Sequence, residues 1–171
     1  EVSKKRNIKM IHTSTSECYG TAIYTPIDES HPLQGQSPYS ASKISADKII
    51  ESYHNSFGTN TITIRPFNVF GPGQSARAII PTIISQLIQS NNIEVGSTSP
   101  IRDFTYVDDT VNAFIQAAQH ENISGDLINI GNGKGISIKD LIYKCAEILN
   151  IENININVSN ERNRPEKSEV F

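Results

Sequence analysis

The chain of 171 residues is long enough for one domain with a hydrophobic core, or for part of a larger protein. Its 15 Lys and Arg against 18 Asp and Glu give a net charge of -3, and they form no basic run of the kind that nucleic-acid-binding proteins carry. No apolar run is long enough to span a bilayer, and no signal peptide opens the sequence. We therefore expect a cytoplasmic protein with neither a membrane nor a nucleic-acid partner.

The sulfur and imidazole side chains suggest no metal chemistry. Cys18 and Cys145 form no CxxC pair, and the histidines are scattered without ligand spacing. This usage is typical of a reducing compartment, and it predicts neither a disulfide nor a metal site. Candidate functional residues must come from other motifs.

In the first half of the chain, segments with strand and helix periods alternate. Residues 7–14 are a short apolar run before a polar cluster and predict a buried strand. A helix begins at Ser37, a favourable N-cap followed by proline, and its apolar residues recur at helical spacing as far as Gly58, a natural stop. Residues 60–67 predict the next strand, which Pro66 ends.

The second half continues the same alternation. In chain order we expect a Gly/Pro turn at 71–74, helices near 80–89 and 111–118, a strand and turn at 126–133, a helix from 137 to 149, and a half-exposed strand at 154–158. Strands separated by helices predict an α/β fold with a mainly parallel sheet. Only about three good central strands are visible, fewer than the roughly five or six of an average sheet, so we expect a chain that is cut at both ends.

One short motif places a phenol beside an ammonium. In SPYSASK, residues 37–43, Tyr39 stands four positions before Lys43 and shares a helix face with it. Taken alone, so loose a motif is more typical of a solvated helix face than of an active site.

The surrounding motifs change this interpretation. STSECYG (14–20) follows the first strand, SPYSASK opens the first long helix, and RPFNVFGP (65–72) follows the second strand. With RDFTYVDD (102–109) and RPEKSE (164–169), their order resembles the extended short-chain dehydrogenase/reductase superfamily. The resemblance is greatest to its nucleotide-sugar dehydratases, decarboxylases and epimerases.

The resemblance implies an incomplete Rossmann-type doubly wound parallel sheet, its N-terminal part missing, with a smaller α/β substrate-binding region. We expect residues 1–70 to be the C-terminal portion of an NAD-binding Rossmann domain and 71–125 to hold substrate-binding elements and a return helix. Residues 126–135 would be the last Rossmann strand and turn, and 136–171 a truncated C-terminal substrate-binding part. The GxxGxxG turn that cradles a cofactor pyrophosphate is absent, and GNGKG (131–135) is no substitute for it.

The resemblance also assigns catalytic roles. Tyr39 would remove a proton from a sugar hydroxyl, Lys43 would bind the nicotinamide ribose, and Thr15 would hydrogen-bond the reacting hydroxyl. A phenol with a pKa of about 10 is a poor base at neutral pH unless positive charge such as that of Lys43 favours its ionised form. Glu17 stands where the 4,6-dehydratases carry the base for carbon 5, and Ser16 where they often carry an acid. The alternatives are a solvated loop carboxylate for Glu17 and a turn former for Ser16.

Binding residues follow from the same resemblance. NAD is the implied cofactor, with contacts from Ser14, Tyr39, Lys43 and Pro66. The implied contacts to the nucleotide sugar come from Asn68, Arg77, Arg102 and Arg164. Guanidinium groups bind phosphate oxygens in pairs, which suits a diphosphate. A strand-ending turn is the alternative for the RPFNVFGP motif, and a surface arginine is the alternative for Arg77.

We therefore expect an NAD-dependent nucleotide-sugar 4,6-dehydratase acting on an NDP-hexose or NDP-N-acetylhexosamine. DESHPLQGQSPYSASK (28–43) and GPGQSARAIIPTII (71–84) are most similar to the dehydratases of nonulosonate (legionaminate-type) biosynthesis. The alternatives are a decarboxylase of the UDP-glucuronate type, a 4-epimerase, and an inactive sugar-nucleotide binding fragment. We expect the enzyme to be a homodimer and this chain alone to be inactive.

Overall fold

The computed structural model describes residues 2–6 and 8–159. Its helices are α1 (Val2–Arg6), the 3-10 turn η1 (Ser16–Tyr19), α2 (Pro38–Phe57), α3 (Ile79–Gln89), α4 (Val107–Gln119) and α5 (Ile138–Ile148). Its strands are β1 (Met10–Thr13), β2 (Thr61–Pro66), β3 (Asn68–Phe70), β4 (Asn92–Val95), β5 (Ile101–Tyr106), β6 (Leu127–Ile130), β7 (Gly135–Ser137) and β8 (Asn155–Val158). None of the described helices is long and apolar enough to cross a membrane.

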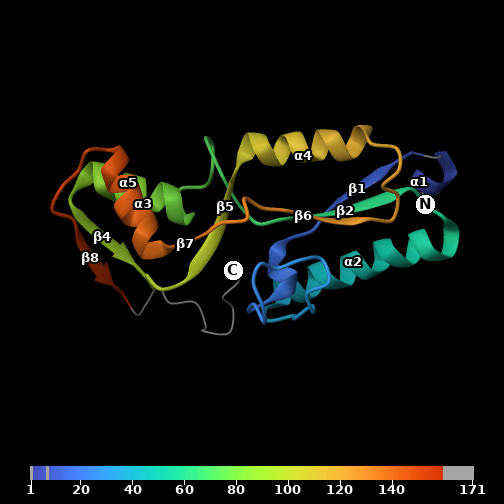
Figure 1. Ribbon diagram of the computed structural model, residues 1–171, viewed down its shortest axis with the longest axis horizontal. Helices are drawn as coiled ribbons and strands as arrows, with labels where there is room; N and C mark the ends of the chain where they lie inside the picture. Colours follow the sequence, from blue (N-terminus) through green and yellow to red (C-terminus); the bar gives the residue numbers. More distant parts are fainter. Residues whose placement is uncertain (1, 7, 160–171) are drawn as a thin grey trace.

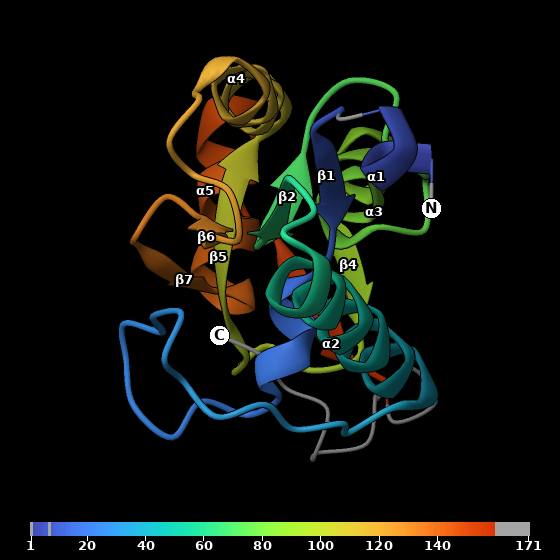
Figure 2. The same cartoon turned by 90° about the vertical axis from the view of Figure 1, so that its right-hand side faces the viewer.

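A parallel sheet with helices on both faces forms one part of the molecule. The strand order is β1-β2-β6, and both pairs are parallel, with Thr13 beside Ile64 and Thr63 beside Leu127. Helix α4 covers one face and α2 the other (Figures 1 and 2). This is the doubly wound α/β arrangement that the alternation of strands and helices predicts.

The two faces of this sheet differ in chemistry. On the α4 side, Ile62 and Ile64 of β2 pack against Ala117 in an apolar cluster. On the α2 side, the alternate residues Thr61, Thr63 and Arg65 are buried as well, although they are polar. Strands of a parallel sheet are usually apolar on both faces, so the polar face needs partners for its buried groups.

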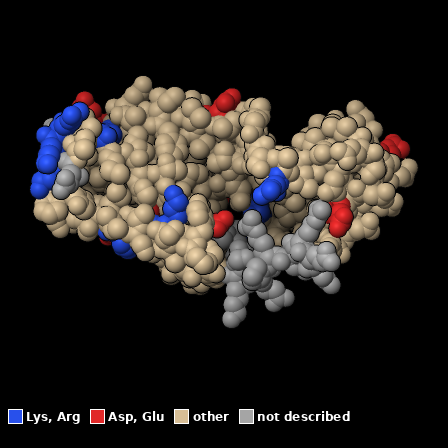
Figure 3. All heavy atoms as spheres, turned by 180° about the vertical axis from the view of Figure 1, so that it is seen from behind, with Lys and Arg blue, Asp and Glu red and all other residues tan. Residues whose placement is uncertain are grey.

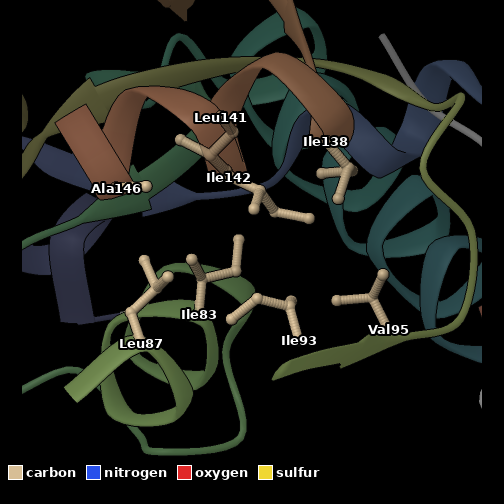
Figure 4. Packing of buried hydrophobic residues seen from close by; sticks show 8 residues of the cluster. All are labelled: Ile83, Leu87, Ile93, Val95, Ile138, Leu141, Ile142 and Ala146. Carbon is tan, nitrogen blue, oxygen red and sulfur yellow. The ribbon is translucent and has the colours of Figure 1, made fainter. Parts of the chain in front are cut away.

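The second part of the molecule has an apolar core. Strands β3, β5 and β7 form a mixed sheet, and β4 pairs with β8 in parallel. Side chains of α5 point toward those of α3 and β4 (Figure 4). The buried members of this apolar cluster are Ile83, Leu87, Ile93, Val95, Ile138, Leu141, Ile142 and Ala146.

Helix α2, which carries the Tyr39–Lys43 pair, begins and ends as its sequence predicts. Ser37 accepts a hydrogen bond from the Ser40 N–H at 3.0 Å, and the Ser40 hydroxyl accepts one from the Ser37 N–H at 2.9 Å. Gly58 ends the helix at φ 61, a left-handed conformation that glycine adopts without strain. The first turn of α2, where Tyr39 lies, is therefore fixed by a reciprocal cap.

Charged side chains are sparse on the face seen from behind in Figure 3. Basic side chains are densest at the end of the molecule where α1 contributes Lys4, Lys5 and Arg6, and a few others lie apart along the face. On this face they form no continuous basic stripe.

Candidate active site

The predicted catalytic residues lie at the carboxyl edge of the β1-β2-β6 sheet. The Ser14 N–H donates to the Ile64 carbonyl at 2.7 Å, so β1 and β2 end side by side. Thr15 and Pro66 follow at this edge because the two strands run parallel in matched register. Open α/β sheets bind their ligands outside the carboxyl ends of their strands.

Thr15 and Glu17 share one turn. Thr15 has extended backbone angles and caps η1, and its Oγ1 accepts a hydrogen bond from the Glu17 N–H at 3.2 Å. The Ser16 side chain between them is buried, whereas Glu17 is half-buried. A hydroxyl and a carboxylate are thus held two residues apart where the chain leaves β1.

Tyr39 and Lys43 lie on the side of α2 that meets this turn. The Lys43 Nζ donates to the Thr13 carbonyl at 3.0 Å, and it lies 6.0 Å from the centroid of the Tyr39 ring. The Tyr39 side chain is 50% exposed. An ammonium group has three N–H donors, so Lys43 keeps donors for a ligand after it bonds to the strand end. The structure therefore brings the phenol and ammonium to the strand that leads into Thr15.

Three of the four predicted substrate-binding residues line one cavity. Asn68, Arg77 and Arg102 border a space of about 490 Å³ at the junction of the sheet with the second part of the molecule. Small-molecule sites of about 300–1,000 Å³ are usual. Arg164 lies outside the described residues.

The motif analysis missed Gln74, which also lines this cavity. Its Nε2 donates to the Val69 carbonyl at 2.9 Å, which fixes the orientation of the amide. The Oε1 is buried and has no hydrogen-bond partner among the described residues. A ligand N–H could satisfy this acceptor. In the sequence, a glutamine after Gly-Pro-Gly cannot be distinguished from a solvated turn residue.

The glycine-rich segment 131–135 is anchored by a carboxylate. Asp103 accepts hydrogen bonds from the Asn132 N–H at 2.9 Å and the Gly133 N–H at 2.8 Å. A Cβ at Gly131 would lie 2.8 Å from the Asp103 Oδ2, so a larger residue there would displace this carboxylate. These amide donors are already used by the chain itself, in contrast to those of a phosphate-binding turn.

Burial changes the ionisation of two groups below the site. Burial raises the pKa of the Cys18 thiol, so the thiol stays protonated at neutral pH. Burial also raises the pKa of Tyr19, whose hydroxyl donates to the Asn129 Oδ1 at 2.7 Å. Tyr19 is therefore a neutral structural phenol.

Comparison with known proteins agrees with these motifs. A family model described as GDP-mannose 4,6 dehydratase matches residues 1–170. The chain is 30% identical over 173 residues to dTDP-D-glucose 4,6-dehydratase of Homo sapiens. This alignment covers 94% of the chain and 49% of the human protein. The chain spans between about a third and a half of the length of three curated relatives that it matches.

Two solved structures share the fold. UDP-N-acetylglucosamine 4-epimerase from Methanobrevibacter ruminantium M1, in complex with UDP-N-acetylmuramic acid, has a TM-score of 0.82 and 32% identity over 94% of this chain and 53% of that chain. dTDP-glucose 4,6-dehydratase from Bacillus anthracis str. Ames, in complex with NAD, has a TM-score of 0.84 and 27% identity over 92% of this chain and 52% of that chain. With a family match over nearly its whole length, the chain belongs to the GDP-mannose 4,6 dehydratase family of extended short-chain dehydrogenase/reductase enzymes.

Proposed function

We propose that the protein containing this chain is an NAD-dependent nucleotide-sugar 4,6-dehydratase. The observation that carries the proposal is the Lys43 contact with Thr13, at 3.0 Å, because it joins the Tyr39–Lys43 pair to the turn that bears Thr15 and Glu17. A base for a sugar hydroxyl and a carboxylate for a second proton thereby lie at one strand end. Epimerisation at carbon 4 alone does not need the second group.

The residues present fit the nicotinamide and ribose end of NAD. The exposed phenol of Tyr39 and the remaining donors of Lys43 are free to contact a ribose and a sugar hydroxyl. Ser14 and Pro66, at the ends of the two strands, would complete this half of the site. When bound, NAD supplies the hydride acceptor for carbon 4 and the hydride donor for carbon 6.

The chain's own groups then move the protons. Tyr39 takes the proton of the carbon 4 hydroxyl, and the Lys43 charge stabilises the phenolate form that can accept it. Thr15 hydrogen-bonds the same hydroxyl. The ketone formed at carbon 4 acidifies the proton on carbon 5, which Glu17 removes while the carbon 6 hydroxyl takes up a proton and leaves as water. The two protons taken by Tyr39 and Glu17 balance the one that leaves in this water and the one that returns to carbon 5 when hydride reaches carbon 6. The Ser16 hydroxyl is a hydrogen-bonding partner for that leaving group.

The arginine-lined cavity would take the nucleotide diphosphate. Arg77 and Arg102 supply guanidinium groups on its wall, which Asn68 also lines. Arg164 would add a third guanidinium group. We propose a GDP- or UDP-linked N-acetylglucosamine of the nonulosonate type as substrate, on the similarity of segments 28–43 and 71–84 to such dehydratases.

We also propose that the enzyme is a cytoplasmic homodimer that pairs α2 with its copy. Ile49, Tyr53 and Phe57 recur every fourth residue and are 57%, 36% and 53% exposed. Such an apolar stripe is typical of a helix that packs against a partner. An Ile49→Glu variant of the natural full-length protein should halve the mass measured by light scattering. An unchanged dimer mass would contradict this interface.

A 4-epimerase is the second candidate, because the solved epimerase is as similar to this chain as the solved dehydratase. Incubation of the natural full-length protein with candidate sugar nucleotides tests both. A 4-keto-6-deoxy product supports the dehydratase, and a carbon 4 epimer supports the epimerase. Released carbon dioxide would indicate a decarboxylase, and bound ligand without turnover a binding protein.

Glu17→Gln sharpens this test. Loss of a general acid or base costs about 10²–10⁴-fold in rate, so a dehydratase should lose at least about a hundredfold in kcat. The control is Glu147→Gln on α5, which replaces an exposed carboxylate by the same amide. Full turnover of the Glu17→Gln variant would favour the epimerase.

A further inference from the structure

Four polar residues form a buried cluster beneath the candidate active site. Asp47 on α2 accepts hydrogen bonds from the Ser14 hydroxyl at 2.9 Å and from the Arg65 Nε and Nη2 at 3.0 and 2.8 Å. The His12 Nε2 lies 3.0 Å from its other carboxylate oxygen. We call His12, Ser14, Asp47 and Arg65 the Asp47 cluster.

Three members of the cluster are almost inaccessible to water, and His12 is partly buried. Asp47, Arg65 and Ser14 are 4%, 2% and 4% exposed. A buried ion pair of this kind adds little stability relative to apolar residues that fill the same space. Its hydrogen bonds also fix α2 against the end of β1 and against β2.

Geometry gives the cluster a direct route to the site. Tyr39, Lys43 and Asp47 are spaced by four residues, so they lie on one face of α2 in successive turns. Lys43 binds the Thr13 carbonyl, and Asp47 binds the hydroxyl of the next residue, Ser14. Two adjacent turns of the helix thus hold two adjacent residues of the strand end, directly before Thr15.

Arg65 supplies the third attachment and balances the charge. It stands on β2, beside β1, and its guanidinium binds the same Asp47 oxygen as Ser14 does. A lone buried carboxylate two turns from Tyr39 would oppose formation of a phenolate there. Paired with Arg65, Asp47 can hold the strand end without adding net charge.

We propose that Asp47 is a positioning residue for the catalytic step: together with Arg65 it fixes residues 14–17 against the Tyr39–Lys43 face of α2. This inference rests on the proposed function, since it concerns the same reacting groups. Small displacements of catalytic groups, of about 1 Å, can cost about a hundredfold in rate. Asp47 touches neither substrate nor cofactor in this proposal and acts only through Ser14.

The test compares Asp47→Asn with Glu51→Gln in the natural full-length protein. Both variants replace a carboxylate of α2 by an amide, and the two residues lie one helical turn apart. Glu51, however, is 53% exposed and pairs with Lys48 at the surface. For Asp47→Asn we expect kcat to fall about tenfold or more with KM little changed, because only the alignment of reacting groups is lost. Glu51→Gln should leave both constants as they are.

Hydrogen exchange supplies a readout that needs no substrate. In Asp47→Asn, amides of residues 14–19 should exchange about tenfold faster, while amides of the apolar cluster around Ile142 keep their protection. A uniform increase over the whole protein would indicate general destabilisation and would overturn the proposal. So would a kcat within twofold of the wild type.

A double variant separates positioning from stability. Asp47→Leu with Arg65→Met removes both buried charges, so the protein should stay folded. It should nonetheless keep the low kcat, because Ser14 has lost its acceptor. Recovery of wild-type kcat in this folded double variant would overturn the inference. If the wild type turns over no sugar nucleotide, the proposed function fails, and the exchange experiment alone decides whether Asp47 fixes residues 14–17.

Discussion

The layer between α2 and the β1-β2-β6 sheet and the layer between α3, α5 and β4 are both buried, but with different chemistry. The buried members of the second layer, from Ile83 to Ala146, are all aliphatic. The first contains the Asp47 cluster and the threonines of β2. Apolar packing has no preferred direction, whereas each hydrogen bond of the cluster requires one geometry.

The difference corresponds to the different tasks of the two layers. The apolar layer lies behind the arginine-lined cavity and needs only to hold its wall in place. The polar layer lies behind Thr15, Glu17, Tyr39 and Lys43, where the proposed function would require each group to be held in position. Buried polar networks that are fully satisfied specify a unique arrangement, at the cost of being sensitive to the loss of any one member.

The largest effect should come from breaking the buried ion pair on one side. Arg65→Met leaves the Asp47 carboxylate buried without its cation, and removal of one partner of such a pair costs about 3–5 kcal/mol. Urea unfolding of the natural protein would measure this loss. The Asp47→Leu, Arg65→Met double variant should lose much less. An equal loss in both would mean that the pair itself contributes the stability.

A cavity in the apolar layer should cost somewhat less. Ile142 is fully buried, and an Ile→Ala change at such a site costs about 2–5 kcal/mol. Ile148, on the same helix and 69% exposed, gives the matched control, for which a surface substitution should stay within about 0.5 kcal/mol. The Ile142→Ala variant should keep the protection of amides 14–19, because the two layers are separate. Faster exchange there would contradict the comparison.

A smaller effect concerns Tyr19 and high pH. Because burial raises its pKa, the unfolded chain loses the phenol proton first as the pH rises. Stability from the neutral phenol is therefore present below about pH 10 and falls above it. Tyr19→Phe removes the hydrogen bond to Asn129, so the unfolding free energy should fall by about 1 kcal/mol at neutral pH. The variant should also show a smaller decrease in unfolding free energy at alkaline pH. Unfolding free energies of both proteins measured from pH 7 to pH 11 test these two expectations. The same slope against pH in the variant and the wild type above pH 10 would contradict the role of Tyr19.

The smallest effect should come from an exposed ion pair in the apolar part. Lys144 and Glu147 on α5 are 2.8 Å apart but 56% and 69% exposed. Exposed pairs contribute about 0–1 kcal/mol, so Glu147→Gln should shift the unfolding free energy by no more than that. A loss of unfolding free energy as large as that of Arg65→Met would show that buried and exposed ion pairs do not differ in this protein.

Much of the fold follows from periodicity in the sequence. Helices α2, α3, α4 and α5 were predicted within a few residues, because each shows a sustained helical spacing of apolar residues. The strands β1, β2, β6 and β8 were predicted as short apolar or alternating runs. Strands β3 and β7 have only three residues each, too few to show a period. Strand β5 was not predicted, because the charged residues Arg102 and Asp103 interrupt its apolar pattern.

The candidate site shows the same limit. Thr15, Glu17 and the Tyr39–Lys43 pair could be placed together because parallel strands end at one edge, but their roles stay predictions. Asp47 and Arg65 could not be found in this way, since charged residues are almost never fully buried unless they pair, and their pairing joins elements 18 residues apart. The alternation in residues 61–65 shows that β2 is polar on one face, but only the three-dimensional structure shows that this face is buried.

The carboxylate of Asp103 has a mechanical consequence for the enzyme. It ties β5, the strand of Arg102, to the turn that follows β6 in the Rossmann-type sheet. Movement of β5 away from this turn would break both hydrogen bonds, so they resist a change in the distance between the two elements. In the proposed enzyme, the separation between the arginine that would bind a diphosphate and the edge where Tyr39 would act is thus constrained by the chain itself.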